Sequence, residues 1–206
     1  MPQPFISLFI PNLDGGGAER VMLHLAEGFA ERGFDVDLVV AQAEGAYLSK
    51  IPETIRLVNL DARSPVILFK TLALKHYLKQ EQPAFLISTL DISSSATWAK
   101  RLAGVNTQVV MCVQTNLSQQ FRDRHAMLMQ KIKWAVVRRF YPWADAIVTA
   151  SEGVARDIEQ HAKISMQQMT VIHNPLVTSD FSEKAQGAVA QPWFSDDQPP
   201  VLLGVG

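Results

Sequence analysis

The stretch FISLFIPNLDGGGAERVMLHLAEGFAERGFDVDLVV, residues 5–40, holds two short apolar runs that flank a glycine-rich turn and a segment of helical period. The runs at its two ends have the apolar, β-branched composition of buried strands. Between them, Val21, Leu25 and Phe29 fall on one helical face, and Gly33 supplies a C-terminal stop. The stretch therefore predicts a strand, a helix and a second strand, which is the repeating unit of a parallel sheet.

The rest of the chain repeats this alternation. Further strands are predicted at 55–60, 84–88, 107–113, 146–150 and 169–173. Further helices are predicted near 65–80, 93–103, 119–140 and 152–161. Alternating strands and helices predict an α/β fold, in which helices cover both faces of a parallel sheet.

The composition excludes several function classes. The 206 residues are 48% hydrophobic and 19% charged, as in an ordinary globular protein, and the net charge of −1 disfavours a nucleic-acid partner. Cys112 is the only cysteine, so an intramolecular disulfide cannot form, and a buried thiol in a reducing cytoplasm is expected. The histidines lack metal-ligand spacing, so no metal is expected. The apolar run at 5–10 is too short for a signal peptide or a membrane span.

The C-terminal part of the chain differs from the rest in composition. We expect residues 1–177 to form one domain and residues 178–200, which gather Ser, Gly, Asp and Pro, to form a linker. Residues 201–206, VLLGVG, read as another apolar strand. Because a parallel strand buried on both faces is not stable alone, this strand is expected to open a second domain that the chain does not contain.

Gly15, Gly16 and Gly17 stand between the first predicted strand and helix. The first N–H groups of a helix lack backbone partners and favour an anion, and glycine removes the side chains that would hold a phosphate away. The turn is thus predicted to face a diphosphate, and the alternative is a tight turn that allows close packing. The dinucleotide pattern G-x-G-x-x-G is not matched, because Arg20 stands at its last glycine. A nicotinamide-dependent oxidoreductase is therefore only the alternative.

Residues 11–40 resemble the N-terminal segment of the family 4 (group 1) retaining glycosyltransferases, in which a Gly-Gly-Ala-Glu-Arg run precedes the first helix. Phe34 stands where the family commonly has histidine. The final LLGVG resembles the opening strand of the family's donor-binding domain. Four further segments agree in order and spacing, at 85–104, 109–119, 143–158 and 171–177.

This resemblance implies a GT-B architecture, in which two Rossmann-like domains face each other across a cleft, with this chain as the N-terminal, acceptor-binding domain. It implies transfer of a sugar with retention from a nucleotide-sugar donor to a saccharide or lipid-linked saccharide acceptor, as in polysaccharide or cell-envelope biosynthesis, without a metal or other cofactor. Gly15, Gly16 and Gly17 would then bind the donor phosphates. Because most donor contacts belong to the other domain, this chain alone is expected to be inactive. The alternative is the nucleotide-binding domain of an oxidoreductase or a sugar-nucleotide epimerase.

Polar residues near the strand ends are the remaining site candidates, because ligands of open parallel sheets bind outside the carboxyl ends of the strands. Ser88, Gln114 and Asn116 are candidates for binding acceptor hydroxyl groups. Asp91 is the candidate catalytic residue, which would orient or deprotonate the acceptor hydroxyl. Its alternative role is to cap the following helix, as expected for Ser151 before the helix at 152–161.

The segment at 119–143 is unusually basic, with six Lys or Arg residues and one acid between positions 122 and 139. On a helical wheel, Lys131, Trp134 and Arg138 share one face, which suits an anionic membrane surface. The core stripe is predicted to be Leu128, Ile132, Ala135 and Val136. A cytoplasmic protein that is peripheral at the inner face of a membrane is the resulting expectation. The alternative is a partly buried helix with a solvated basic edge.

Overall fold

The computed structural model describes residues 4–62, 67–89, 93–121 and 127–175, together with the short pieces 185–187, 191–194 and 199–202. The chain divides into two compact units, Met1–Asn174 and Pro175–Gly206. The second unit contains the short 3-10 helix η5 (Pro192–Phe194). Of the strand predicted at its end, Val201 and Leu202 have no regular structure, and residues 203–206 lie outside the described residues.

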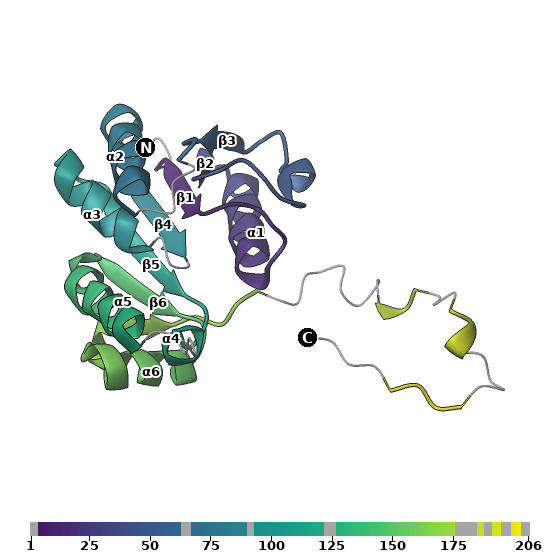
Figure 1. Ribbon diagram of the computed structural model, residues 1–206. Coiled ribbons are helices and arrows are strands. Elements are labelled where there is room, and N and C mark those ends of the chain that lie inside the picture. Colours follow the sequence, from purple (N-terminus) through teal and green to yellow (C-terminus); the bar gives the residue numbers. More distant parts are fainter. Residues whose placement is uncertain are drawn as a thin grey trace. The chain divides into compact units, whose positions relative to one another are not determined.

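The first unit is built on a seven-stranded parallel sheet with the order β3-β2-β1-β4-β5-β6-β7 (Figure 1). Its register pairs Leu8 with Leu38 on one side and with Ile87 on the other. This arrangement confirms the predicted α/β fold with a parallel sheet. The strands are β1 (Ile6–Ile10), β2 (Val36–Val40), β3 (Arg56–Asn59), β4 (Phe85–Thr89), β5 (Gln108–Val113), β6 (Ala146–Thr149) and β7 (Met169–Val171).

Helices follow most strands, and two of them begin or end at residues that favour a helix terminus. Gly33, at a φ of +82°, follows the first helix, and Ser151 caps the last one by accepting a hydrogen bond from the Val154 N–H. The predicted cap at Ser151 is thus confirmed. The α-helices are α1 (Gly17–Glu31), α2 (Ile67–Glu81), α3 (Ser93–Ala103), α4 (Leu117–Gln120), α5 (Met127–Phe140) and α6 (Glu152–Ala162). Short 3-10 turns are η1 (Leu48–Lys50), η3 (Tyr141–Trp143) and η4 (Met166–Gln168).

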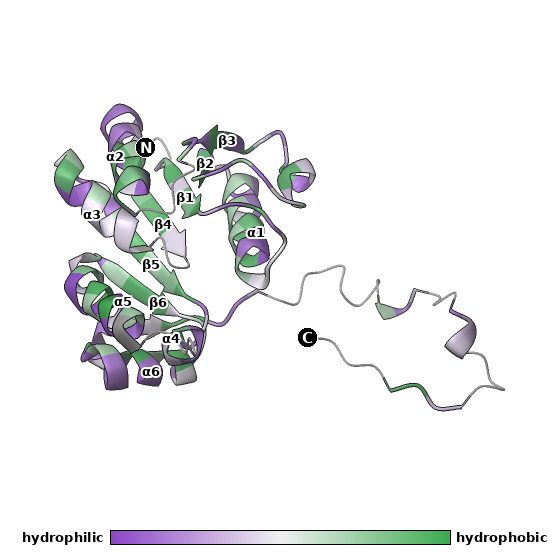
Figure 2. Ribbon diagram, viewed as in Figure 1, coloured by the Kyte–Doolittle hydropathy of each residue, from purple (hydrophilic) through white to green (hydrophobic). Residues whose placement is uncertain are grey.

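Two hydrophobic cores lie on the two faces of the sheet, because successive side chains of a strand point to opposite faces. Leu8 and Ile10 pack with Met22 of α1 in one core. Phe9 packs in the other core, together with side chains of α2, α3, α5 and α6. Figure 2 shows the strands as mainly hydrophobic and the helices as mixed, as expected for helices that bury one face.

The α1 side of the sheet is less completely covered at β5 and β6. Val110, Cys112 and Val148 alternate with buried residues of the other core and are only half-buried. Cys112 is therefore less enclosed than the sequence predicts. Burial still raises the pKa of its thiol to about 11, so the thiol stays protonated at neutral pH.

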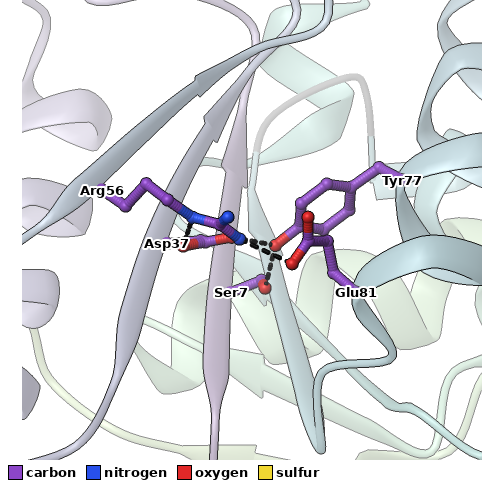
Figure 3. Close-up of polar contacts among 5 residues, drawn as sticks. All are labelled: Ser7, Asp37, Arg56, Tyr77 and Glu81. Carbon is purple, nitrogen blue, oxygen red and sulfur yellow. Dashed lines mark hydrogen bonds and ion pairs between the residues drawn. The ribbon is translucent and has the colours of Figure 1, made fainter.

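A polar cluster joins β1, β2, β3 and α2 near the amino ends of the strands, with Ser7, Asp37 and Tyr77 buried (Figure 3). The Arg56 guanidinium donates to both carboxylate oxygens of Asp37, at 2.7 and 2.6 Å, and also to Glu81 at 2.8 Å. The Tyr77 hydroxyl donates to Asp37 at 2.6 Å and lies 2.6 Å from the Ser7 hydroxyl. Because the only phenolic hydrogen goes to Asp37, the Ser7 hydroxyl is the donor to Tyr77. Burial and the Asp37 contact raise the pKa of Tyr77 above its ordinary value.

Candidate functional site

The carboxyl ends of the strands meet at one edge of the sheet, because all strands run parallel. The glycine segment follows β1 at this edge, and Gln114 and Asn116 follow β5. His173 and Asn174 follow β7. The cluster around Asp37 lies toward the opposite edge and is therefore structural.

The three glycines have three different environments. Gly15 has a φ of +108°, so it is the position at which the turn itself requires glycine. Gly16 is the N-cap of α1 in an extended conformation, and a Cβ there would collide with the Glu19 carboxylate. At Gly17, the first helical residue, a Cβ would meet nothing within 4 Å. The glycine segment is therefore tight at its start and open where the helix begins.

The N-terminus of α1 has free hydrogen-bond donors. The first helical hydrogen bond runs from the Arg20 N–H to the Gly16 carbonyl, at 3.1 Å. The N–H groups of Gly17, Ala18 and Glu19 precede that bond and have no backbone partner in the helix. The Glu19 carboxylate folds back over Gly16, where it complements the positive end of the helix dipole.

The environment of Ser88 differs from the predicted one. Its side chain is fully buried, and its hydroxyl has no hydrogen-bond partner among the described residues. The strand continues to Thr89, so Ser88 is not its last residue, and alternation places Ser88 on the same face as Leu86, which packs with α3. Ser88 is therefore not presented at the carboxyl edge of the sheet, and its contact with an acceptor stays a prediction.

Gln114 and Asn116 are half-buried at the carboxyl edge. The structure brings Gln114 to Asn174, whose side-chain amide donates to its oxygen at 3.5 Å. His173 is exposed beside them, and its Nδ1 lies 3.1 Å from the Ala150 carbonyl oxygen. Sequence reasoning missed Asn174, although its place directly after a predicted strand was a usable signal. Asp91, the predicted catalytic residue, lies outside the described residues, so both of its predicted roles stay predictions.

The face assignment of α5 is inverted relative to the sequence prediction. Trp134 is 8% exposed, because its indole stacks on His161 and meets Phe121 edge-on. Ile132, predicted to be in the core, is 47% exposed, and Ala135 is exposed as well. The ring therefore has little free surface to insert into a membrane, and the predicted membrane contact of Trp134 stays a prediction.

The two basic residues predicted on the membrane face have different environments. The Arg138 guanidinium donates two hydrogen bonds to the His161 carbonyl oxygen, at 3.1 and 2.7 Å, near the C-terminus of α6. It therefore holds α5 against α6 and complements the helix dipole. Lys131 is exposed, as predicted. Met129 is 49% exposed and adds to the outward apolar surface of the same helix.

The parts of the chain that the structure describes contain no candidate membrane span and no candidate metal site. None of the helices there is long and apolar enough to cross a membrane. No group of three or more His, Cys, Asp or Glu side chains there could hold a metal ion.

A profile described as Glycosyltransferase Family 4 matches residues 15–180. No curated protein sequence matches the chain. Among solved structures, the lipopolysaccharide outer core galactosyltransferase WaaB in its apo form gives a TM-score of 0.60 at 16% identity, over 83% of this chain and 46% of that chain. Anabaena HepE in complex with UDP-glucose gives a TM-score of 0.60 at 14% identity, over 89% of this chain and 49% of that chain. UDP-N-acetylglucosamine 2-epimerase from Rickettsia bellii gives a TM-score of 0.60 at 14% identity, over 88% of this chain and 48% of that chain. The chain thus spans about half the length of the structures it matches, and at these identities the likeness shows the fold.

Proposed function

The chain belongs to glycosyltransferase family 4, and from that premise we propose that it is the acceptor-binding half of an enzyme that transfers a sugar from a nucleotide-sugar to a saccharide or lipid-linked saccharide. In this reaction the bond between the anomeric carbon and the diphosphate breaks, and a glycosidic bond to the acceptor oxygen forms with retention of configuration. The proposed reaction uses neither a metal nor another cofactor. Cell-envelope polysaccharide synthesis is the proposed setting, supported by the lipopolysaccharide neighbour.

The observation that carries the donor part of this proposal is the open N-terminus of α1. Three backbone N–H groups there lack helical partners, and the space over Gly17 is empty. A diphosphate in this space would accept those hydrogen bonds and lie at the positive end of the helix dipole. The Glu19 carboxylate now lies close to this position, so it would move aside because like charges repel.

The acceptor part of the proposal rests on side chains that can both donate and accept hydrogen bonds. Gln114, Asn116 and Asn174 present amide groups at the same edge, and such groups match the paired donor and acceptor character of sugar hydroxyls. An amide is not a base at neutral pH, so these residues bind and orient. Asp91 is the proposed group that orients or deprotonates the attacking hydroxyl.

The test is a pair of glycine substitutions in the complete protein. Gly17→Val places a branched side chain in the space proposed for the diphosphate, while meeting no neighbour that would disturb the fold. It should lower kcat/KM for release of nucleoside diphosphate at least about tenfold, equivalent to about 1.4 kcal/mol. Gly28→Ala in the same helix, where a Cβ would meet only the flexible Arg32 side chain, is the matched control and should leave kcat/KM unchanged. Full activity of a folded Gly17→Val protein would remove the glycine segment from the donor site.

A sugar-nucleotide epimerase is the second candidate, favoured by the Rickettsia bellii neighbour. An epimerase converts its nucleotide-sugar without an acceptor and forms no glycoside. A glycosyltransferase releases nucleoside diphosphate as it forms one. Analysis of products with and without added saccharide therefore separates the two reactions.

The location of the enzyme at the cytoplasmic face of an anionic membrane is also part of the proposal, with α5 as the contact. This helix has four Lys or Arg residues and no acid, and its exposed side chains include Met129, Lys131 and Ile132. Exposed apolar side chains among cations suit the headgroup region of anionic lipids. The apolar contact is thus assigned to Met129 and Ile132 in place of Trp134.

A further inference from the structure

A pocket of about 220 Å³ lies between α1 and the segment that follows β2. Its floor includes Leu23, which is 4% exposed. The other lining residues are polar or aromatic: Arg20, His24, Glu27, Tyr47 and Lys50. Leu23 and Tyr47 also pack in the core on this face of the sheet, and the polar side chains have no role in the donor and acceptor sites described above.

One wall of this pocket is fixed to Leu13, which shortly precedes the three glycines. The Leu13 N–H donates to the Glu44 carbonyl at 2.9 Å, and the Tyr47 N–H donates to the Leu13 carbonyl at 3.1 Å. Gly45, at a φ of +117°, lies so close to the Leu13 backbone that any side chain would collide with it. The segment that carries Tyr47 and Lys50 is therefore held in place beside the start of α1.

The charges in the pocket are unneutralised. Among the described residues, the side chains of Arg20 and His24 have no hydrogen bond or ion pair, and the Lys50 ammonium contacts only the Tyr47 ring, at 4.8 Å from its centroid. A larger cavity of about 460 Å³ beside Arg56 provides the contrast. There the guanidinium is already paired with Asp37 and Glu81. Unlike this larger cavity, the small pocket has cations available to a ligand.

The charges that line the pocket differ between its two ends. Arg20, Leu23 and Glu27 lie on successive turns of α1, so Arg20 and Glu27 are about 10 Å apart along the helix axis. A cation therefore stands near the glycine segment, and a carboxylate stands farther down the helix. An anionic group fits the first end, and hydroxyl groups that donate to a carboxylate fit the second.

We propose that this pocket binds a phosphorylated saccharide. Arg20 and Lys50 bind the phosphate, with His24 as a further donor, while Glu27 and the Tyr47 hydroxyl bind sugar hydroxyl groups. The volume of about 220 Å³ suits a ligand of one sugar ring better than a whole nucleotide-sugar, since pockets for drug-sized ligands exceed about 300 Å³. The choice of a saccharide rests on the proposed function, because the substrates of that reaction are saccharides.

Direct binding tests the proposal without any transfer reaction. Calorimetric titration of the chain with glucose 6-phosphate should show tighter binding than titration with glucose or with inorganic phosphate. Arg20→Met and Lys50→Met should each weaken glucose 6-phosphate binding at least about tenfold, because each removes a charge-assisted contact to the phosphate. Lys79→Met, which removes an exposed lysine on α2, is the control and should leave the dissociation constant unchanged.

Two further outcomes decide between anion binding and sugar binding. Glu27→Gln should weaken glucose 6-phosphate binding and leave inorganic phosphate binding unchanged. Inorganic phosphate binding as tightly as glucose 6-phosphate would overturn the saccharide assignment. Equal affinities of the wild type, Arg20→Met and Lys50→Met would overturn the site itself. Since no donor is present, failure here leaves the glycoside-forming activity to be judged separately by its own product analysis.

Discussion

Replacing Arg56 by methionine tests the polar cluster of Figure 3, because it removes one partner of a buried charge and keeps most of the side-chain volume. Asp37 is 3% exposed at its side chain and accepts three of the hydrogen bonds in the cluster, two of them from Arg56. Without Arg56, only the Tyr77 hydroxyl would still compensate the carboxylate. Leaving a buried charge without its partner costs about 3–5 kcal/mol. Because Arg56 is itself 53% exposed and water can replace part of it, we expect a loss of about 3 kcal/mol in the free energy of unfolding.

Urea denaturation followed by circular dichroism measures this loss, with Glu81→Gln as the matched control. Glu81 accepts from the same guanidinium at 2.8 Å but is 35% exposed, so its loss should cost at most about 1 kcal/mol. A double substitution of Asp37 and Arg56 should cost less than the sum of the two single changes, because the two groups contact each other. A loss below about 1 kcal/mol for Arg56→Met, or strict additivity with Asp37→Asn, would refute the reasoning.

Three further predictions follow from individual side chains. The pKa of Tyr77 is raised in the folded state. The stability that its protonated form contributes is therefore complete below about pH 10 and is lost as the pH rises above that value. Urea titrations at alkaline pH should show a smaller loss of stability for Tyr77→Phe. Because the pKa of Cys112 is raised to about 11, its alkylation by iodoacetamide in the folded protein should accelerate about tenfold per pH unit between pH 8 and 10, measured by mass spectrometry. The protein should sediment with anionic vesicles at low salt and not with neutral ones, and Ile132→Glu should abolish this while Leu102→Glu on α3 does not; equal sedimentation of both variants would contradict a contact through α5.

The order of strands and helices could be predicted because it depends on local patterns. The run at 35–40 is apolar with strand composition, and β2 occupies Val36–Val40. Ser151 is a good N-cap wherever a helix follows it, and it is the N-cap of α6. Features of this kind need only a few neighbouring residues.

The faces of α5 and the polar cluster could not be predicted, since both depend on distant residues. A helical wheel of α5 contains two apolar stripes. The stripe with Trp134 is the buried one, because Trp134 packs against Phe121 and against His161 of α6. The Ser7 and Tyr77 hydroxyls are 70 residues apart in sequence, and no local pattern pairs them. The burial of Ser88 could not be predicted either, because β4 continues to Thr89, one residue beyond the predicted strand.

The interior position of β1 in the sheet has a consequence for how the chain folds during synthesis. On one side β1 pairs with β2, which follows shortly after it, but on the other side Ile6 pairs with Phe85 of β4. Until residue 89 has left the ribosome, the first strand therefore keeps a whole edge of unpaired backbone groups, which is a template for pairing with other chains. Such late, non-local pairing slows folding and exposes the nascent chain to aggregation. A chaperone that shields this edge during translation should therefore raise the yield of folded protein more than one supplied after release.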